Sequence, residues 1–183
     1  DLDSLEDFAV YGEFTWQATD EWQLTAGVRW FEQSMKREAF LTSPFYAVDC
    51  SLSEAACSTI NNSETFSKTI YKLNSSYDIG EDSMVYFTRS QGYRRGGTNT
   101  LPAEGERFHE YGVPLTYTPD IVTNNEIGLK GYLFKQRFSY TLAAYYMQWE
   151  DIQLDTFSPA NDYQMAFNGG EAISQGIELE TNF

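Results

Sequence analysis

Apolar and polar residues alternate over long stretches of this chain. In residues 8–18, Phe14 and Trp16 fall on one parity, and Glu13 and Thr15 fall on the other. Successive side chains of a strand point to opposite faces, so this alternation predicts a strand with one apolar and one polar face. The same pattern recurs and predicts seven strands, at residues 8–18, 22–33, 66–79, 83–93, 120–134, 137–150 and 172–183.

The predicted strands are long, and their connections are alternately short and long. Strands of soluble proteins average about 5–6 residues, whereas a tilted strand that crosses a bilayer needs about 9–11. Short periplasmic turns and long extracellular loops are typical of outer-membrane barrels. The pattern therefore predicts an all-β antiparallel meander that crosses a membrane as an open piece of a barrel. The short connections are 20–21, 80–82 and 135–136, and the long ones are 34–65, 94–119 and 151–171.

Tryptophans support the same reading. Trp16 and Trp22 flank the first short turn, and Trp30 follows Trp22 by eight residues on the same face. At about 3.3 Å per residue and a tilt near 40°, the last two rings would lie roughly 20 Å apart along the membrane normal. That separation suits two aromatic girdles around an apolar band. The alternative is that these rings pack in the core of a soluble β-sandwich.

Charge and hydrophobicity narrow the classes of function. The 183 residues contain 27 acidic and 12 basic side chains, a net charge of −15, which disfavours a nucleic-acid partner because phosphate binding needs a basic surface. No run of 18 or more apolar residues could form a transmembrane helix. A transmembrane strand gives no such run, since every second residue faces the lumen.

Two cysteines, Cys50 and Cys57, lie within the polar segment 43–63. We expect them to form a disulfide on an exposed loop in an oxidising compartment, with two free thiols as the alternative. With a single histidine in the chain, a zinc site is improbable, and we expect no metal and no cofactor.

Four stretches resemble the TonB-dependent outer-membrane receptors. The first, SQGYRRGGTN at residues 90–99, is similar to a strand-to-loop motif S-x-G-[YF]-[KR]-x-G-G-x-N. The other three follow in the family's order, although Asp120 stands where glutamate is usual. They are residues 117–130, similar to P-E-x…N-x-E-x-G-x-K, residues 143–153, similar to A-x-[YF]-Y-x-x-[YW]-x-D-x-Q, and residues 168–180, similar to N-x-G-x-A-x-x-x-G-x-E-x-E.

The resemblance implies a 22-stranded barrel in the bacterial outer membrane, closed by an N-terminal plug and driven by a TonB-type complex. Seven strands would form about a third of that wall. We therefore expect residues 1–183 to be a partial barrel domain, with the plug, the TonB box and the last strand outside this sequence. The expected partners are outer-membrane lipid, the plug, the TonB-type complex and the solute.

The resembled family most commonly imports ferric siderophores, while haem, cobalamin and oligosaccharides suit the wall equally. Cations and aromatic rings in the long connections suit anionic or ring-rich chelates. The candidate capture residues are Tyr93, Arg94, Arg95, Asn99, Arg107, His109 and Tyr111. Four charged residues on the polar parity are expected to face the lumen, either exposed to water or paired with one another: Glu126, Lys130, Glu178 and Glu180.

The apolar parity is expected on the convex, lipid-facing side of the wall. A charge in the middle of the bilayer would cost about 2–4 kcal/mol for Arg or Lys. No nucleotide-binding glycine motif occurs, and His109 has no partner at catalytic spacing, so no enzyme is indicated. Two alternatives stay open: a passive porin or anchor with the same wall, and a soluble carbohydrate-binding β-sandwich.

Overall fold

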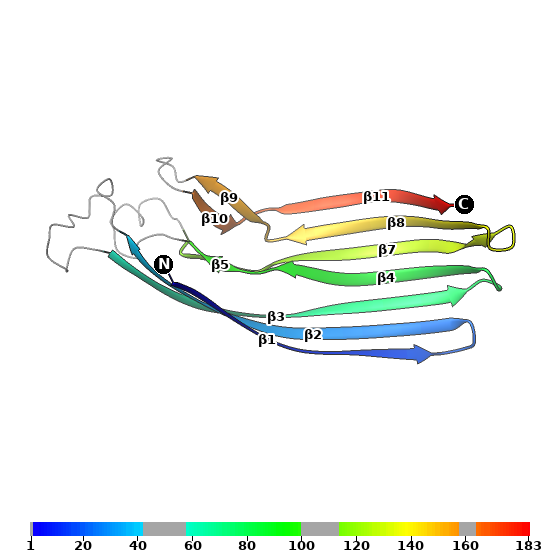
Figure 1. Ribbon diagram of the computed structural model, residues 1–183, viewed down its shortest axis with the longest axis horizontal. Coiled ribbons are helices and arrows are strands. Elements are labelled where there is room, and N and C mark those ends of the chain that lie inside the picture. Colours follow the sequence, from blue (N-terminus) through cyan, green and yellow to red (C-terminus); the bar gives the residue numbers. More distant parts are fainter. Residues whose placement is uncertain (1, 42–57, 100–113, 158–163) are drawn as a thin grey trace.

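The computed structural model describes residues 2–41, 58–99, 114–157 and 164–183, and its long strands lie side by side in one sheet (Figure 1). The sheet has seven strands in the order β1-β2-β3-β4-β7-β8-β11. Among the described residues, no helix is long and apolar enough to cross a membrane. The seven strands are β1 Leu2–Gln17, β2 Trp22–Leu41, β3 Ser58–Asp78, β4 Ser83–Arg94, β7 Asp120–Leu133, β8 Phe138–Glu150 and β11 Glu171–Asn182.

The predicted antiparallel meander is confirmed. Each long strand pairs with the next long strand of the chain, and every one of these pairings is antiparallel. Within the described residues, β1 and β11 each have a neighbour on one side only. The sheet is therefore open, as predicted.

The predicted strand bounds were too short at one end of the first three strands. The β2 and β3 ladder continues to the pair of Leu41 with Ser58, inside the segment 34–65 that was predicted to be a loop. Likewise, β1 begins at Leu2 rather than at Phe8. Backbone pairing needs no apolar alternation, so the ladder continues where the alternating pattern ends.

Four short strands lie within the other two long connections and were not predicted. They form two small antiparallel sheets of their own. Elements of two to five residues are too short to show an alternating pattern. Their bounds are β5 Gly97–Thr98, β6 Thr116–Tyr117, β9 Gln153–Phe157 and β10 Gln164–Asn168.

The short connections, 18–21, 79–82 and 134–137, lie together at one end of the sheet, opposite the β5, β9 and β10 end (Figure 1). In the last of them, Phe134, Lys135 and Gln136 have φ of 55°, 59° and 66°. Three consecutive left-handed residues without glycine are unusual, since side chains disfavour that conformation. The adjoining β7–β8 ladder ends at the pair of Leu133 with Phe138, directly beside this turn.

Strand register separates the side chains into two faces. Residues directly opposite one another on neighbouring strands share a face, so each pairing extends a face across the sheet. One face, called the apolar face here, carries Phe14, Trp16, Leu24, Val28, Leu129, Leu142 and Ile177. The other, called the polar face, carries Glu13, Arg29, Glu126, Lys130, Glu178 and Glu180. All these residues share faces as predicted, and which face lines a lumen stays a prediction.

The apolar face is uncovered. Phe14 is 70% exposed and Ile177 is 76% exposed, and Trp16, Trp22 and Trp30 are exposed on the same face. Within the described residues, only Phe31 and Ala143 are buried hydrophobic residues. A soluble sandwich would bury one face of this sheet against a second sheet. The long sheet is instead a wall one layer thick, whose apolar side needs an apolar environment.

The two faces can be tested with neighbouring substitutions in β7. Leu129→Arg places a charge on the apolar face, and we expect a loss of about 2–4 kcal/mol in folding into lipid vesicles, because lipid cannot hydrate the guanidinium. Lys130→Leu changes the polar face and should leave insertion nearly unchanged. The measurement is the urea dependence of folding of the full-length protein. Tolerance of Leu129→Arg combined with failure of Lys130→Leu would reverse the assignment of the faces.

Candidate functional site

The ends of β4 and β7 that adjoin the long connections are joined by an ion pair whose carboxylate is buried. Asp120, the first residue of β7, is directly opposite Arg94, the last residue of β4. The Asp120 side chain is fully buried, whereas that of Arg94 is 48% exposed. Arg94 Nε donates to Asp120 Oδ2 at 2.9 Å, and Arg94 Nη2 donates to the same oxygen. A buried carboxylate is tolerated because the guanidinium is its counterion.

The same ion pair also holds the start of β9. The backbone N of Gln153 donates to Asp120 Oδ2 at 3.1 Å, and Arg94 Nη2 donates to the Gln153 carbonyl oxygen at 3.1 Å. The Arg94 guanidinium also lies 4.6 Å from the centre of the Trp149 ring, a cation–π contact. Asp120 and Arg94 therefore join three segments that are far apart in the sequence.

Two amide side chains extend these contacts to the neighbouring connections. Gln153 Nε2 donates to the carbonyl oxygens of Arg95 at 2.7 Å and Thr118 at 3.0 Å. Asn168 Oδ1 accepts from the backbone N of Thr118 at 2.6 Å, and its Nδ2 donates to the carbonyl oxygens of Thr118 and Asp151 at 2.9 and 2.8 Å. These amides satisfy backbone groups that have left the strand ladder.

The side chain of Asn99 also pairs with backbone groups of the connections. Its Nδ2 donates to the carbonyl oxygens of Pro114 at 2.8 Å and Ala166 at 2.7 Å, and its Oδ1 accepts from the backbone N of Ala166 at 2.7 Å. The residue is only 5% exposed. Asn99 thus links the segment after β5 to β10, a separation of 67 residues in the sequence.

A glycine beside these contacts is required for space. A Cβ at Gly96 would lie 2.7 Å from the Tyr117 carbonyl oxygen and 2.9 Å from atoms of both Phe66 and Pro119. Real Cβ atoms do not approach this closely, and the carbonyl and proline contacts cannot simply rotate away. Only glycine fits here while the Tyr117 backbone and the Pro119 ring stay in place.

We call this group the strand-end network and define it as Arg94, Asn99, Asp120, Gln153 and Asn168. Its five members come from the four sequence stretches that resemble receptor motifs. The structure brings these stretches together at one end of the wall. These polar motif residues therefore have a physical role, because their side chains join the bases of the long connections to the strand ends. Asp120, Gln153 and Asn168 were not predicted as site residues. They are polar motif residues close to the ends of the predicted strands, and this position could have identified them.

The structure describes four of the seven candidate capture residues. Arg94 and Asn99 belong to the strand-end network. The Tyr93 ring stacks on Phe31 with centroids 3.9 Å apart, and Arg95 pairs with Asp7 at 2.7 Å. Arg107, His109 and Tyr111 lie outside the described residues, as do Cys50 and Cys57 with their predicted disulfide. A role in capture stays a prediction for all seven.

The predicted lumen-facing charges interact through a tyrosine. Tyr86 Oη donates to Glu126 Oε1 at 2.7 Å, and Lys130 Nζ lies 5.6 Å from the centre of the Tyr86 ring. The ring lies over Gly128, where a Cβ would clash with it. In the described part of the chain, none of the ion pairs joins two of Glu126, Lys130, Glu178 and Glu180. Their charges are therefore not neutralised by one another.

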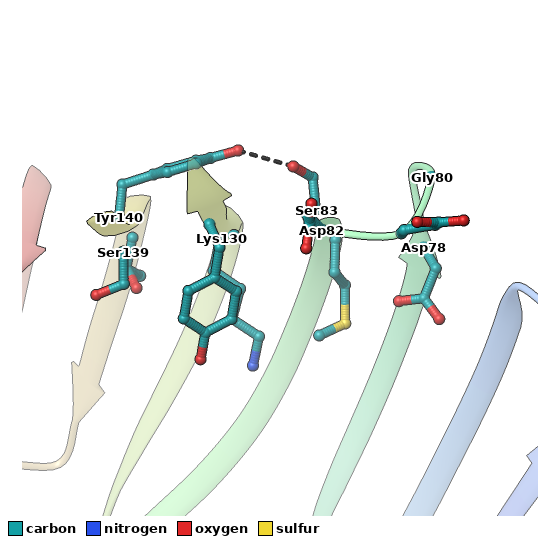
Figure 2. A pocket seen from close by; sticks show the side chains of 12 residues that line it. Asp78, Gly80, Asp82, Ser83, Lys130, Ser139 and Tyr140 are labelled. Carbon is teal, nitrogen blue, oxygen red and sulfur yellow. Dashed lines mark hydrogen bonds between the residues drawn. The ribbon is translucent and has the colours of Figure 1, made fainter. Parts of the chain in front are cut away.

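A recess of about 640 Å³ lies at the opposite end of the wall, beside the short connections. Figure 2 shows Tyr140 reaching toward Ser83, and their hydroxyl oxygens are 3.0 Å apart. Asp78, Asp82 and Lys130 also line it, so cations and anions are mixed. The recess is distant from the strand-end network and contains none of the candidate capture residues. Within the described residues, no group of three or more His, Cys, Asp or Glu side chains could hold a metal ion.

The chain belongs to the family described as TonB dependent receptor-like, beta-barrel, which matches residues 2–183. Its localisation is therefore the bacterial outer membrane. Among curated relatives, the pesticin receptors of Yersinia enterocolitica and Yersinia pestis are 23% identical over 183 residues, covering 98% of this chain. The chain spans 24% of the length of these relatives.

Solved structures show the same fold. The ferric yersiniabactin uptake receptor of Yersinia pestis superposes with a TM-score of 0.74 at 21% identity, covering 98% of this chain and 24% of that one. The siderophore receptor PiuA of Acinetobacter baumannii gives 0.65 at 21% identity, covering 98% and 23%. A copper transporter, OprC, gives 0.66 at 16% identity, covering 98% and 26%. Proteins named for different cargoes thus share this wall.

The ion pair of the strand-end network gives a direct prediction. Asp120→Asn puts an NH2 group, or a weaker neutral acceptor, where four N–H groups now donate to the carboxylate. We expect a loss of about 1–3 kcal/mol in the free energy of unfolding, the usual range for hydrogen bonds to a charged group. Urea unfolding in lipid vesicles measures it. Asp20→Asn, an exposed acid in a short turn, is the matched control, and equal effects of the two variants would contradict the assignment.

Glycine substitutions test the packing at the same place. Gly96→Ala should lower the free energy of unfolding by about 1–3 kcal/mol, the usual cost of overpacking, because its Cβ meets the Tyr117 carbonyl oxygen and the Pro119 ring. Gly92→Ala is the control, since a Cβ there meets nothing within 4 Å. The readout is the rate at which a protease cleaves between β4 and β7 in the folded protein. Faster cleavage only in Gly96→Ala is the expected result, and identical rates would refute the packing argument.

Proposed function

We propose that this chain is part of the barrel wall of an outer-membrane receptor that imports a ferric siderophore with energy from a TonB-type complex. The observation that carries the proposal is the family match over residues 2–183, on a wall one layer thick with one exposed apolar face. Proteins of similar fold are named as a ferric yersiniabactin uptake receptor, a siderophore receptor and a ferripyoverdine receptor.

In this proposal the two faces have different solvents. The apolar face contacts outer-membrane lipid, whose tails offer no hydrogen-bond partners. The wall needs none there, because the strand ladder pairs its backbone N–H and C=O groups. Glu126, Lys130, Glu178 and Glu180 on the polar face contact water and polar plug surface, where their charges stay hydrated. The wall thereby separates lipid from the path of the solute.

The strand-end network has a supporting role in capture. The network fixes the base of the connection between β4 and β7, so that this connection leaves the wall at fixed points. The same connection carries the candidate residues Arg95, Arg107, His109 and Tyr111. Cations and aromatic rings on such loops suit an anionic, ring-rich ferric chelate. We propose that Arg94 and Asn99 serve capture through this anchoring, since their polar atoms already contact protein groups.

Energy coupling requires parts beyond this wall. The chain spans about a quarter of the relatives it matches, and we propose that it works together with a plug, further barrel strands and a TonB-type complex. The cargo is proposed at the level of a class. The fold alone does not identify the cargo, because a protein named as a copper transporter has a similar fold.

Uptake by cells tests this function. A strain with the full-length gene, compared with its deletion, should accumulate more radioactive iron when supplied with ferric siderophores, and removal of TonB or of the proton-motive force should abolish the difference. The substitutions Arg107→Ala and His109→Ala should raise the concentration for half-maximal uptake. Asp20→Asn, in a short connection at the opposite end of the wall from the strand-end network, should not raise this concentration.

Other outcomes would contradict the proposal in identifiable ways. Uptake that persists without TonB would indicate passive diffusion through a porin. Accumulation of copper or haem, but not of ferric siderophores, would retain active import and replace the cargo. No accumulation of any of these solutes would favour an anchoring role for the barrel.

A further inference from the structure

Among the cations in the middle of the described strands, Arg89 alone lies on the apolar face. Register places Arg89 of β4 directly opposite Leu73 of β3 and Asn125 of β7, on the face that carries Ile127 and Leu129. The other cations in the middle of the described strands, among them Arg29, Lys72 and Lys130, are on the polar face. Lys36 shares the parity of the apolar face, but it lies six residues beyond Trp30 and pairs with Glu38.

Arg89 is held in position without a counterion. Its Nη1 donates to Asn125 Oδ1 at 2.8 Å, an exposed contact. Of the ion pairs in the described part of the chain, none includes Arg89. The guanidinium has five N–H donors, so several remain available for an external acceptor. Asn125 orients the Arg89 side chain, but its neutral amide does not compensate the positive charge of the guanidinium.

The surroundings of Arg89 change character along the strands. Three exposed neighbours on the same face are apolar: Leu73 lies directly opposite Arg89, and Phe87 and Ile127 lie on its short-turn side. On the other side, Gln91 Nε2 donates to Thr123 Oγ1 at 3.2 Å, and Gln148 lies opposite Thr123. Arg89 therefore lies at the boundary between an apolar band and a polar belt.

The depth of this boundary fits a lipid head group. Asn125 precedes Leu133, at the short-turn end of β7, by eight residues, which is roughly 20 Å along the membrane normal at about 3.3 Å per residue and a tilt near 40°. The apolar band of such barrels is about 25 Å tall. Arg89 is thus near the membrane–water interface on the side of the long connections. In outer-membrane barrels the long loops are extracellular, so this interface belongs to the outer leaflet.

We propose that Arg89, oriented by Asn125, binds a phosphate group of the glycolipid that forms the outer leaflet. Leu73, Phe87 and Ile127 contact its acyl chains, and Gln91 and Thr123 face the sugar region. A guanidinium pairs with phosphate in a bidentate geometry, and interfacial cations attract anionic head groups. This inference rests on the membrane orientation given under the proposed function, but not on the cargo.

The experiment uses the full-length receptor in detergent and bisphosphorylated lipid A as the probe. Native mass spectrometry measures the affinity of the receptor for the lipid. Arg89→Gln should weaken binding about fivefold, the effect of one interfacial cation. Arg89→Lys should retain most of the affinity, and Arg29→Gln, an equal change of charge on the polar face, should retain all of it.

Removal of phosphates from the probe tests the same contact without any substitution. Lipid A with one phosphate or none should bind the unchanged receptor more weakly, and phosphatidylglycerol should not replace it. Equal affinity for all of these lipids, or an unchanged affinity in Arg89→Gln, would overturn the proposal. Solute uptake is measured separately, so a receptor that imports no siderophore but loses lipid A with Arg89→Gln would refute only the proposed function.

Discussion

The structure depends on the requirement that every backbone polar group inside a bilayer has a partner within the protein. No water reaches the apolar face at that depth, so unpaired N–H and C=O groups would be very unfavourable. The antiparallel ladders meet this requirement between neighbouring strands, and the outer edges of β1 and β11 have no partner strand among the described residues. The period of two follows from it, because an extended ladder turns alternate side chains toward lipid and toward the polar face.

At the strand ends the same requirement is met by side chains. Where β4 and β7 leave the ladder, the carboxylate of Asp120 accepts hydrogen bonds from Arg94 and from the backbone of Gln153. The amides of Asn99 and Asn168 pair with backbone groups of connections far away in the sequence. The strand-end network is therefore the continuation of the ladder by side chains, and it makes the bases of the long connections part of the wall.

This division also explains why one wall can suit receptors for different cargoes. The ladder and the strand-end network depend on backbone geometry and a few polar side chains, and neither requires a particular solute. Loop tips can then vary while the strand ends stay fixed, as is general for binding loops on rigid scaffolds. The TM-scores of 0.74 and 0.66 to proteins named for yersiniabactin and copper are consistent with this view.

The sequence alone determined the seven strands, their order and the two faces, because alternation over nine or more residues has few other physical explanations. Glu126 and Leu129 could be assigned to opposite faces from their parity alone. The sequence did not reveal the extension of β2 and β3 to Leu41 and Ser58, since backbone pairing alone leaves no alternating pattern. Nor could it show that Asp120, Gln153 and Asn168 meet, or that Arg94 and Asn99 are engaged there. Such contacts join residues up to 67 positions apart, and only the register of several strands together brings them within hydrogen-bonding distance.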